Sequence, residues 1–242
     1  MEETAVPAWP RRVLVVSGVL VGVFALVAAA RVPVADSSVW LEASTVAVSA
    51  LVLVAAAWWM AGRSATIDRR TVLLWGLGWG FGLGALWIAE IAFNNVTPPT
   101  VSTASNRGVV DNVTWAVVGL ATFVTAAWVT VRTGRWRSGL RAGVWSGVGS
   151  GLGASLGGAA LLAFLRSDVE RDPLMLSEWQ QRASDMDLAT YVTRETMAGV
   201  GGHLWVLGIA QGAVVGLAAA SLGIVVVRLR GDSRPTAARS AQ

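Results

Sequence analysis

The stretch "WGLGWGFGLGALWIAEIAF", residues 75–93, combines two features that rarely occur in one apolar segment. A glycine stands at every second position from Gly76 to Gly84, and a glutamate, Glu90, follows near the end. Alternation at period two is typical of a strand. A membrane strand, however, needs only about 9–11 residues and must close into a barrel with many similar strands. This segment is longer and no other segment repeats its pattern, so we predict a membrane-spanning helix.

Apolar segments of similar length recur along the whole chain. Of the 242 residues, 54% are hydrophobic and 14% are charged, with a mean hydropathy of +0.58, whereas soluble domains have about a quarter charged residues. Runs of about 18 or more apolar residues predict transmembrane helices. We therefore predict an all-α, polytopic membrane helix bundle forming a single membrane domain over residues 1–242. Its six transmembrane helices are expected at residues 13–30, 43–61, 72–93, 113–131, 142–165 and 197–227.

The basic residues predict the orientation of these helices. All 19 are arginines, and 13 of them fall at the termini or in the connections that share a side with the termini. The positive-inside rule then predicts two cytoplasmic termini in a multi-pass bacterial plasma-membrane protein. The same rule explains the isoelectric point of about 11.1, so we expect no nucleic-acid partner. Residues 13–30 also resemble a secretory signal peptide, with small residues at 28–30, which leaves cleavage of this segment open.

The glycines of residues 75–93 form two rows when they are placed on a helix. Gly76, Gly80 and Gly84 make one row, and Gly78 and Gly82 make another about 160° away. Neighbouring helices are expected to approach closely on both sides. An alternative is that smooth glycine faces let helices slide, as transporters require. The glycines expected to pack helices closely are Gly76, Gly80, Gly84, Gly147, Gly151, Gly212 and Gly216.

Four polar residues form a candidate site inside the membrane. Glu90 lies about 5 Å below the outer boundary, and His203 lies about 9 Å deep from the same side, at 1.5 Å per residue. Gln211 lies near mid-membrane, and Arg166 stands at an outer helix end. A charge at the bilayer centre costs about 2.5–3.5 kcal/mol. We therefore expect Glu90 to have a partner, with His203, Arg166 and Arg194 as candidates, or else to reach the headgroups or form a purely structural pair.

Catalytic chemistry finds little support in the sequence. The absence of cysteine and the presence of a single histidine exclude thiolate zinc sites, and we expect neither a metal nor a cofactor. The segment "GASLG" at 153–157 matches G-x-S-x-G. A nucleophile elbow, however, requires a strand-to-helix turn, and Ser155 lies inside a predicted helix. We therefore predict no catalytic residues and no enzymatic activity.

The outer connection 166–196 carries its own helical pattern. Asp172 can cap a helix that begins at Pro173, and its apolar face would comprise Met175, Leu176, Trp179 and Ala183. This pattern predicts an interfacial amphipathic helix, which serves either as a plain connector or as a lid over Glu90 and His203. A second helix is expected to begin at Ser184 and to bend at the glycines before His203. The polar connection 94–112 is expected to be irregular.

Two functions are compatible with these features. The first is a transporter or permease-like transport component. The chain is similar in length and helix number to the six-helix permeases of ATP-binding-cassette exporters, and this resemblance implies a membrane or ATPase partner subunit beside the lipid bilayer. The second is a non-enzymatic accessory or regulatory membrane protein that acts by binding partners.

Overall fold

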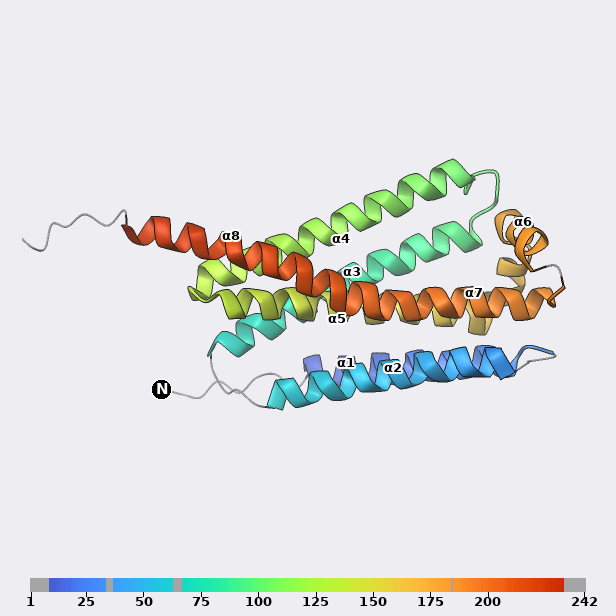
Figure 1. Ribbon diagram of the computed structural model, residues 1–242, viewed down its shortest axis with the longest axis horizontal. Helices are drawn as coiled ribbons and strands as arrows, with labels where there is room; N and C mark the ends of the chain where they lie inside the picture. The colour runs from blue at the N-terminus through green and yellow to red at the C-terminus, as the bar shows by residue number, and fades with distance from the viewer. Residues whose placement is uncertain (1–8, 34–36, 63–66, 184, 233–242) are drawn as a thin grey trace, which may run out of the picture.

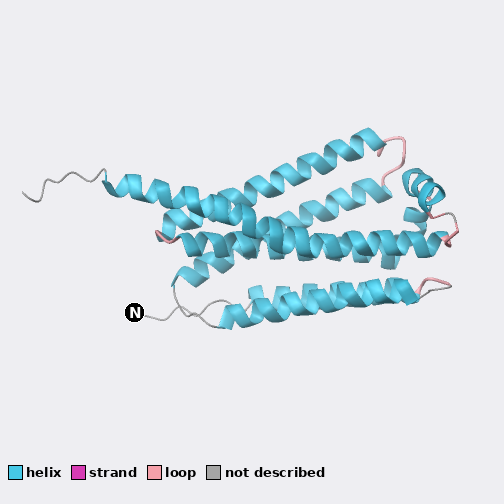
Figure 2. Ribbon diagram, in the orientation of Figure 1, coloured by secondary structure: helices cyan, strands magenta, loops and turns pink. Residues whose placement is uncertain are grey.

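The described part of the chain is helical apart from short loops (Figure 2). The computed structural model describes residues 9–33, 37–62, 67–183 and 185–232, and these ranges contain no strand. This confirms the all-α prediction. In chain order the elements are α1 (Trp9–Ala30), α2 (Ser37–Gly62), α3 (Ile67–Val96), α4 (Ala104–Thr133), α5 (Trp136–Glu170), α6 (Pro173–Arg182), α7 (Leu188–Gly202), the π-helix η1 (His203–Gln211) and α8 (Gly212–Asp232).

Six segments are long and apolar enough to cross a membrane, as predicted. Five of them are α1 to α5, and the sixth is the continuous span Leu188–Arg230, formed by α7, η1 and α8. These segments fit a multi-pass membrane protein. The α4–α5 turn and the end of α8 lie at one end of the bundle, and α6 lies at the other (Figure 1). We call these the arginine-rich end and the α6 end.

All six spans are longer than hydropathy predicts. The largest differences concern α4, which begins at Ala104 rather than at 113, and the sixth span, which begins at Leu188 rather than at 197. The expectation of an irregular connection at 94–112 is therefore wrong for most of its length. Thr103 caps α4, because its side chain accepts a hydrogen bond from the backbone N–H of Asn106. Polar residues end a hydropathy run, but they do not end a helix whose terminal turns reach beyond the hydrocarbon.

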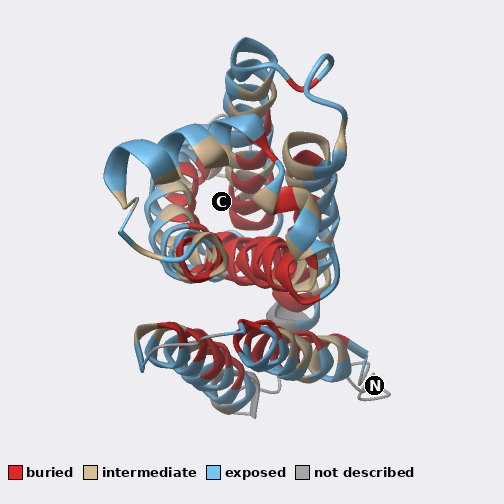
Figure 3. Cartoon of the chain, turned by 90° about the vertical axis from the view of Figure 1, so that its right-hand side faces the viewer, coloured by how far each residue is buried: buried red, intermediate tan, exposed pale blue. Residues whose placement is uncertain are grey.

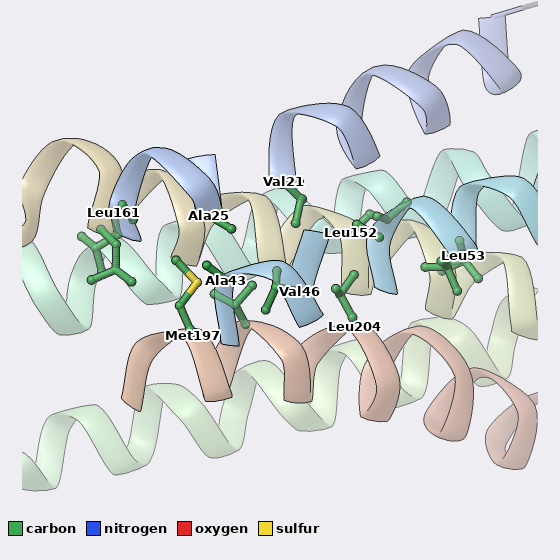
Figure 4. Close-up of a cluster of buried hydrophobic side chains, with 14 of the residues drawn as sticks. Val21, Ala25, Ala43, Val46, Leu53, Leu152, Leu161, Met197 and Leu204 are labelled. Carbon is green, nitrogen blue, oxygen red and sulfur yellow. The ribbon is translucent and has the colours of Figure 1, made fainter. Parts of the chain in front are cut away.

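Helix α5 is the centre of the bundle. About 72% of its most apolar 18-residue stretch is buried, more than in any other span. The buried residues of α5 are visible from the α6 end of the bundle (Figure 3). Helix α3 packs on it, η1 and α8 pack on it, and α1 joins it from the hairpin with α2. A cluster of buried apolar side chains connects the α1–α2 hairpin with α5 and the last span (Figure 4). It includes Val21, Ala43, Leu152, Met197 and Leu204.

Glycine allows backbone contact on two sides of α5. A Cβ atom built on Gly84 would lie 2.9 Å from Gly153 Cα, and one built on Gly143 would lie 2.5 Å from Gly216 Cα. Real Cβ atoms do not approach backbone atoms so closely, so only glycine fits. The same crowding occurs at six of the seven predicted packing glycines, namely Gly76, Gly80, Gly84, Gly147, Gly151 and Gly212. The seventh, Gly216, is slightly less crowded, because a Cβ atom there would lie 3.1 Å from Gly143 Cα.

The second glycine row of α3 behaves differently. Gly78 and Gly82 are exposed, and a Cβ atom on either would meet nothing within 4 Å. The expectation that neighbours approach this helix closely on both sides is therefore wrong within the described chain. The i+4 spacing identifies glycine rows, but it does not say which row faces a neighbour.

Candidate functional site in the α6 half of the bundle

The carboxylate of Glu90 is buried on α3. Only 7% of the residue is exposed, and the side chain accepts a hydrogen bond from Nδ2 of Asn94, one turn further along the same helix. Among the described residues, no arginine lies within ion-pair distance of this carboxylate. Glu90 is thus a membrane-embedded acid whose hydrogen-bond partner is a neutral amide.

The arginines expected as partners of Glu90 bind elsewhere. Arg166 pairs with Glu170 at 2.9 Å and donates a hydrogen bond of 2.7 Å to the carbonyl of Arg31. Arg194 on α7 contacts Glu42 on α2 at 3.3 Å. Each arginine has an acid within one turn of its own helix or on the facing helix. The structure therefore does not bring Arg166 to the Glu90 site.

An aromatic cluster connects Glu90 with His203. Trp87 lies one turn before Glu90 and is 1% exposed. Its ring packs edge-on against Trp115 of α4, with centroids 5.1 Å apart, and against His203 of η1, at 5.2 Å. The Nε1 atom of Trp87 is buried and has no hydrogen-bond partner among the described residues. Trp87 thus contacts His203 and stands one helical turn before Glu90 on α3. Glu90 and His203 make no direct hydrogen bond or ion pair with each other.

Asp111 on α4 is a further acid of this site. It lies within electrostatic range of both Glu90 and His203, and no described arginine forms an ion pair with it. Sequence analysis missed this residue because it placed residue 111 in a loop. The signal was the spacing of Asp111, Thr114 and Val118 at three and four residues, which marks one face of a helix. The latter two side chains are buried.

The predicted residues His203 and Gln211 occupy the two ends of the π-helix η1. The Nδ1 atom of His203 lies 2.7 Å from the carbonyl oxygen of Gly199, one turn earlier. The side chain of Gln211 lies near Gly119 of α4: a Cβ atom built on Gly119 would be 3.5 Å from Nε2 of Gln211. π-Helical segments are rare and often occur at functional sites. Sequence analysis expected a bend before His203 and gave no sign of a π-helix.

The hydrogen bond of Ser155 links two helices and so indicates a structural role for this residue. Its hydroxyl is buried in α5 and donates a 2.9 Å hydrogen bond to the carbonyl of Val200 on α7. On the facing side, Thr122 of α4 and Ser146 of α5 share a buried hydrogen bond of 3.2 Å. These hydroxyls connect neighbouring helices within the apolar interior.

Ion pairs hold the segment between α5 and α7 against the bundle. The carboxylate of Asp172 accepts two hydrogen bonds from Arg107 of α4, at 2.7 and 2.8 Å. Asp172 occupies the N-cap position of α6, directly before Pro173, as expected, but its side chain makes no capping hydrogen bond there. The second helix begins at Leu188 with Asp187 as its cap, whereas the predicted start, Ser184, lies outside the described residues.

The amphipathic helix α6 covers part of the α6 end of the bundle. Met175, Trp179 and Ala183 pack against the apolar cluster shared by α5 and α7, and Nε1 of Trp179 donates a hydrogen bond to the carbonyl of Met186. These contacts support a structural connector. The main contacts of α6 are with α7 and α5.

The site thus combines two acids, one histidine and two tryptophans from α3, α4 and η1. Such an arrangement is suited to exchanging protons or to holding a cation near the membrane surface. Comparisons of the chain with known protein families, with curated proteins and with solved structures found no match.

Proposed function

We propose that the chain is a permease-like membrane transport component whose site at Glu90, Asp111 and His203 binds a proton or a small cation. The observation that carries this proposal is the buried carboxylate of Glu90, which lies in a membrane-spanning segment without an arginine counterion among the described residues. Ionisable residues inside a membrane are costly and commonly mark ion or proton pathways.

The negative charges at this site explain why it would bind a proton or a cation. Glu90 and Asp111 are like charges within electrostatic range of each other, so a proton or a cation bound at this site lowers their electrostatic repulsion. His203 is the only histidine of the chain, and histidine exchanges protons near neutral pH. The nearby π-helix provides a segment whose hydrogen-bond register can change when the charge at His203 changes.

A pH-jump measurement tests this proposal without knowledge of a substrate. Purified protein is reconstituted in liposomes on a solid-supported membrane, and the transient current after a rapid pH change is recorded. We expect a current in the wild-type protein, loss of it in Glu90→Gln, and a changed pH dependence in Asp111→Asn. Glu178→Gln, on the exposed face of α6, is the matched control. Equal currents in Glu90→Gln and wild type would contradict the proposal.

A second candidate function is that of an accessory membrane protein that binds a partner helix. The observation in its favour is the exposed glycine pair Gly78 and Gly82, where an added Cβ atom would meet nothing within 4 Å among the described residues. Small residues on a lipid-facing helix surface allow close approach of another helix. Copurification from native membranes in mild detergent tests it. A stoichiometric partner that is lost on Gly78→Leu would support this function over autonomous transport.

A further inference from the structure

An apolar surface groove runs between α3 and α4, away from the Glu90 site. Its volume is about 450 Å³. The residues that line it include Trp75, Trp79, Val117, Leu120, Val124 and Trp128. Trp75 and Trp128 pack together across the two helices, with ring centroids 4.4 Å apart. Helices α3 and α4 can be followed side by side in Figure 1.

The groove faces the surroundings of the bundle rather than its core. Leu120 is 64% exposed, Val124 is 56% exposed and Trp79 is 49% exposed, and all three lie within membrane-spanning segments. In a bilayer, the medium at such a surface is the hydrocarbon of the lipids. An acyl chain that enters the groove therefore exchanges contacts with other lipid chains for contacts with the groove, and no water is displaced.

The length of the groove corresponds to one leaflet. From Val117 to Trp128 the helix rises by about 16 Å at 1.5 Å per residue. Half of a typical hydrocarbon core is about 15 Å thick. The groove thus extends from the arginine-rich end of the bundle to about the middle of the membrane, which is the depth that a single acyl chain reaches.

One arginine marks the arginine-rich end of the groove. The guanidinium carbon of Arg132 lies 5.2 Å from the centroid of the Trp128 ring. Arg132 is exposed in the last turn of α4, and no described carboxylate lies within ion-pair distance of it. A cation at the end of a leaflet-deep apolar groove is complementary to one kind of molecule, an amphiphile with an anionic head and an apolar chain.

We propose that this groove binds an anionic phospholipid of the leaflet at the arginine-rich end, with one acyl chain along α4 and the phosphate at Arg132. Basic residues between transmembrane helices on the cytoplasmic side are a known type of site for anionic headgroups. The lipid site does not depend on the proposed transport function, since it shares no residue with the Glu90 site.

Lipid binding is testable with purified full-length protein after removal of bound lipid. The probes are phosphatidylglycerol and phosphatidylcholine with identical acyl chains, and retained lipid is counted by native mass spectrometry. We expect several-fold more phosphatidylglycerol than phosphatidylcholine on the wild-type protein. Arg132→Gln should remove this preference, and Val124→Trp, which fills the groove from an exposed position, should reduce the binding of both lipids.

Arg137→Gln is the matched control. Arg137 lies over the ring of Trp136 at 5.8 Å, so it has a similar cation–aromatic contact but no part in the groove. It should keep the preference for phosphatidylglycerol. The proposal is overturned if Arg132→Gln keeps the preference as well, or if Val124→Trp retains as much lipid as the wild type. A lipid-independent dimer abolished by Val124→Trp would also overturn it, in favour of a second copy as the occupant.

Discussion

The backbones of Gly80 on α3 and Gly149 on α5 touch. A Cβ atom on Gly80 would lie 2.6 Å from the carbonyl oxygen of Ser146 and 3.1 Å from Gly149 Cα, and one on Gly149 would lie 2.9 Å from the carbonyl carbon of Gly80. No side chain separates these two helices along this row. The position of α3 against the centre of the bundle, and with it the position of Glu90, therefore depends on the absence of methyl groups.

Replacing Gly80 by alanine is expected to destabilise the protein. The new methyl group must push backbone atoms apart, and overpacking of this kind costs about 1–3 kcal/mol. Gly78→Ala, two residues away on the same helix, is the control, because a Cβ there meets nothing within 4 Å. It should be neutral or stabilising by up to about 1 kcal/mol, the helix propensity difference. Thermal unfolding in detergent compares the two, and equal unfolding temperatures would argue against this contact.

Gly151→Ala is expected to disturb the π-helix. A Cβ atom at this position would lie 2.8 Å from both the carbonyl oxygen of His203 and the backbone nitrogen of Gly208, so α5 and η1 must separate. His203 should then react faster with diethylpyrocarbonate, a histidine reagent, and peptide mass spectrometry can follow this single histidine. Gly202→Ala, in open space on the same span, should leave the rate unchanged. If the rate in Gly151→Ala matches that of the wild type, η1 does not depend on this contact.

Arg107→Gln should loosen the segment between α5 and α7. The pair of Arg107 with Asp172 is bidentate, with side chains 16% and 6% exposed. Removing one member of a buried ion pair costs about 3–5 kcal/mol, and the partial exposure of Arg107 places this pair toward the lower value. Hydrogen exchange of α6 should rise. Arg171→Gln is the control, because it loses only a 3.8 Å ion pair with Asp168 at an exposed position and should change the hydrogen exchange of α6 little. If α6 is equally protected from exchange in both variants, the Arg107 pair does not hold this segment.

Much of the fold could be predicted because it depends on periodicity and hydropathy. Runs of apolar residues locate the six spans, and i+4 rows locate the glycines that stand at helix contacts. The spans extend further than predicted because Asn94, Arg107 and Asp111 are polar yet helical. Hydropathy measures where the hydrocarbon ends, not where hydrogen bonding along the helix ends.

The site was less predictable because it depends on three helices at once. Local sequence placed Glu90 and His203 at similar depths, but it could not show that Trp87 lies beside His203 or that Asp111 lies within electrostatic range of both. Charge suggested His203, Arg166 or Arg194 as a partner for Glu90. Arg166 instead has Glu170 one turn away on its own helix, which is a nearer carboxylate than any on another helix.

Membrane insertion with the arginine-rich end in the cytoplasm is the central claim, and cysteine labelling tests it most directly. The chain has no cysteine, so Ser177→Cys on α6 and Arg137→Cys near the start of α5 each introduce one thiol at an exposed position. In intact cells, a membrane-impermeant maleimide should label Ser177→Cys at once and Arg137→Cys only after permeabilisation. Labelling of both thiols from the same side, or of Arg137→Cys alone from outside, would contradict the account.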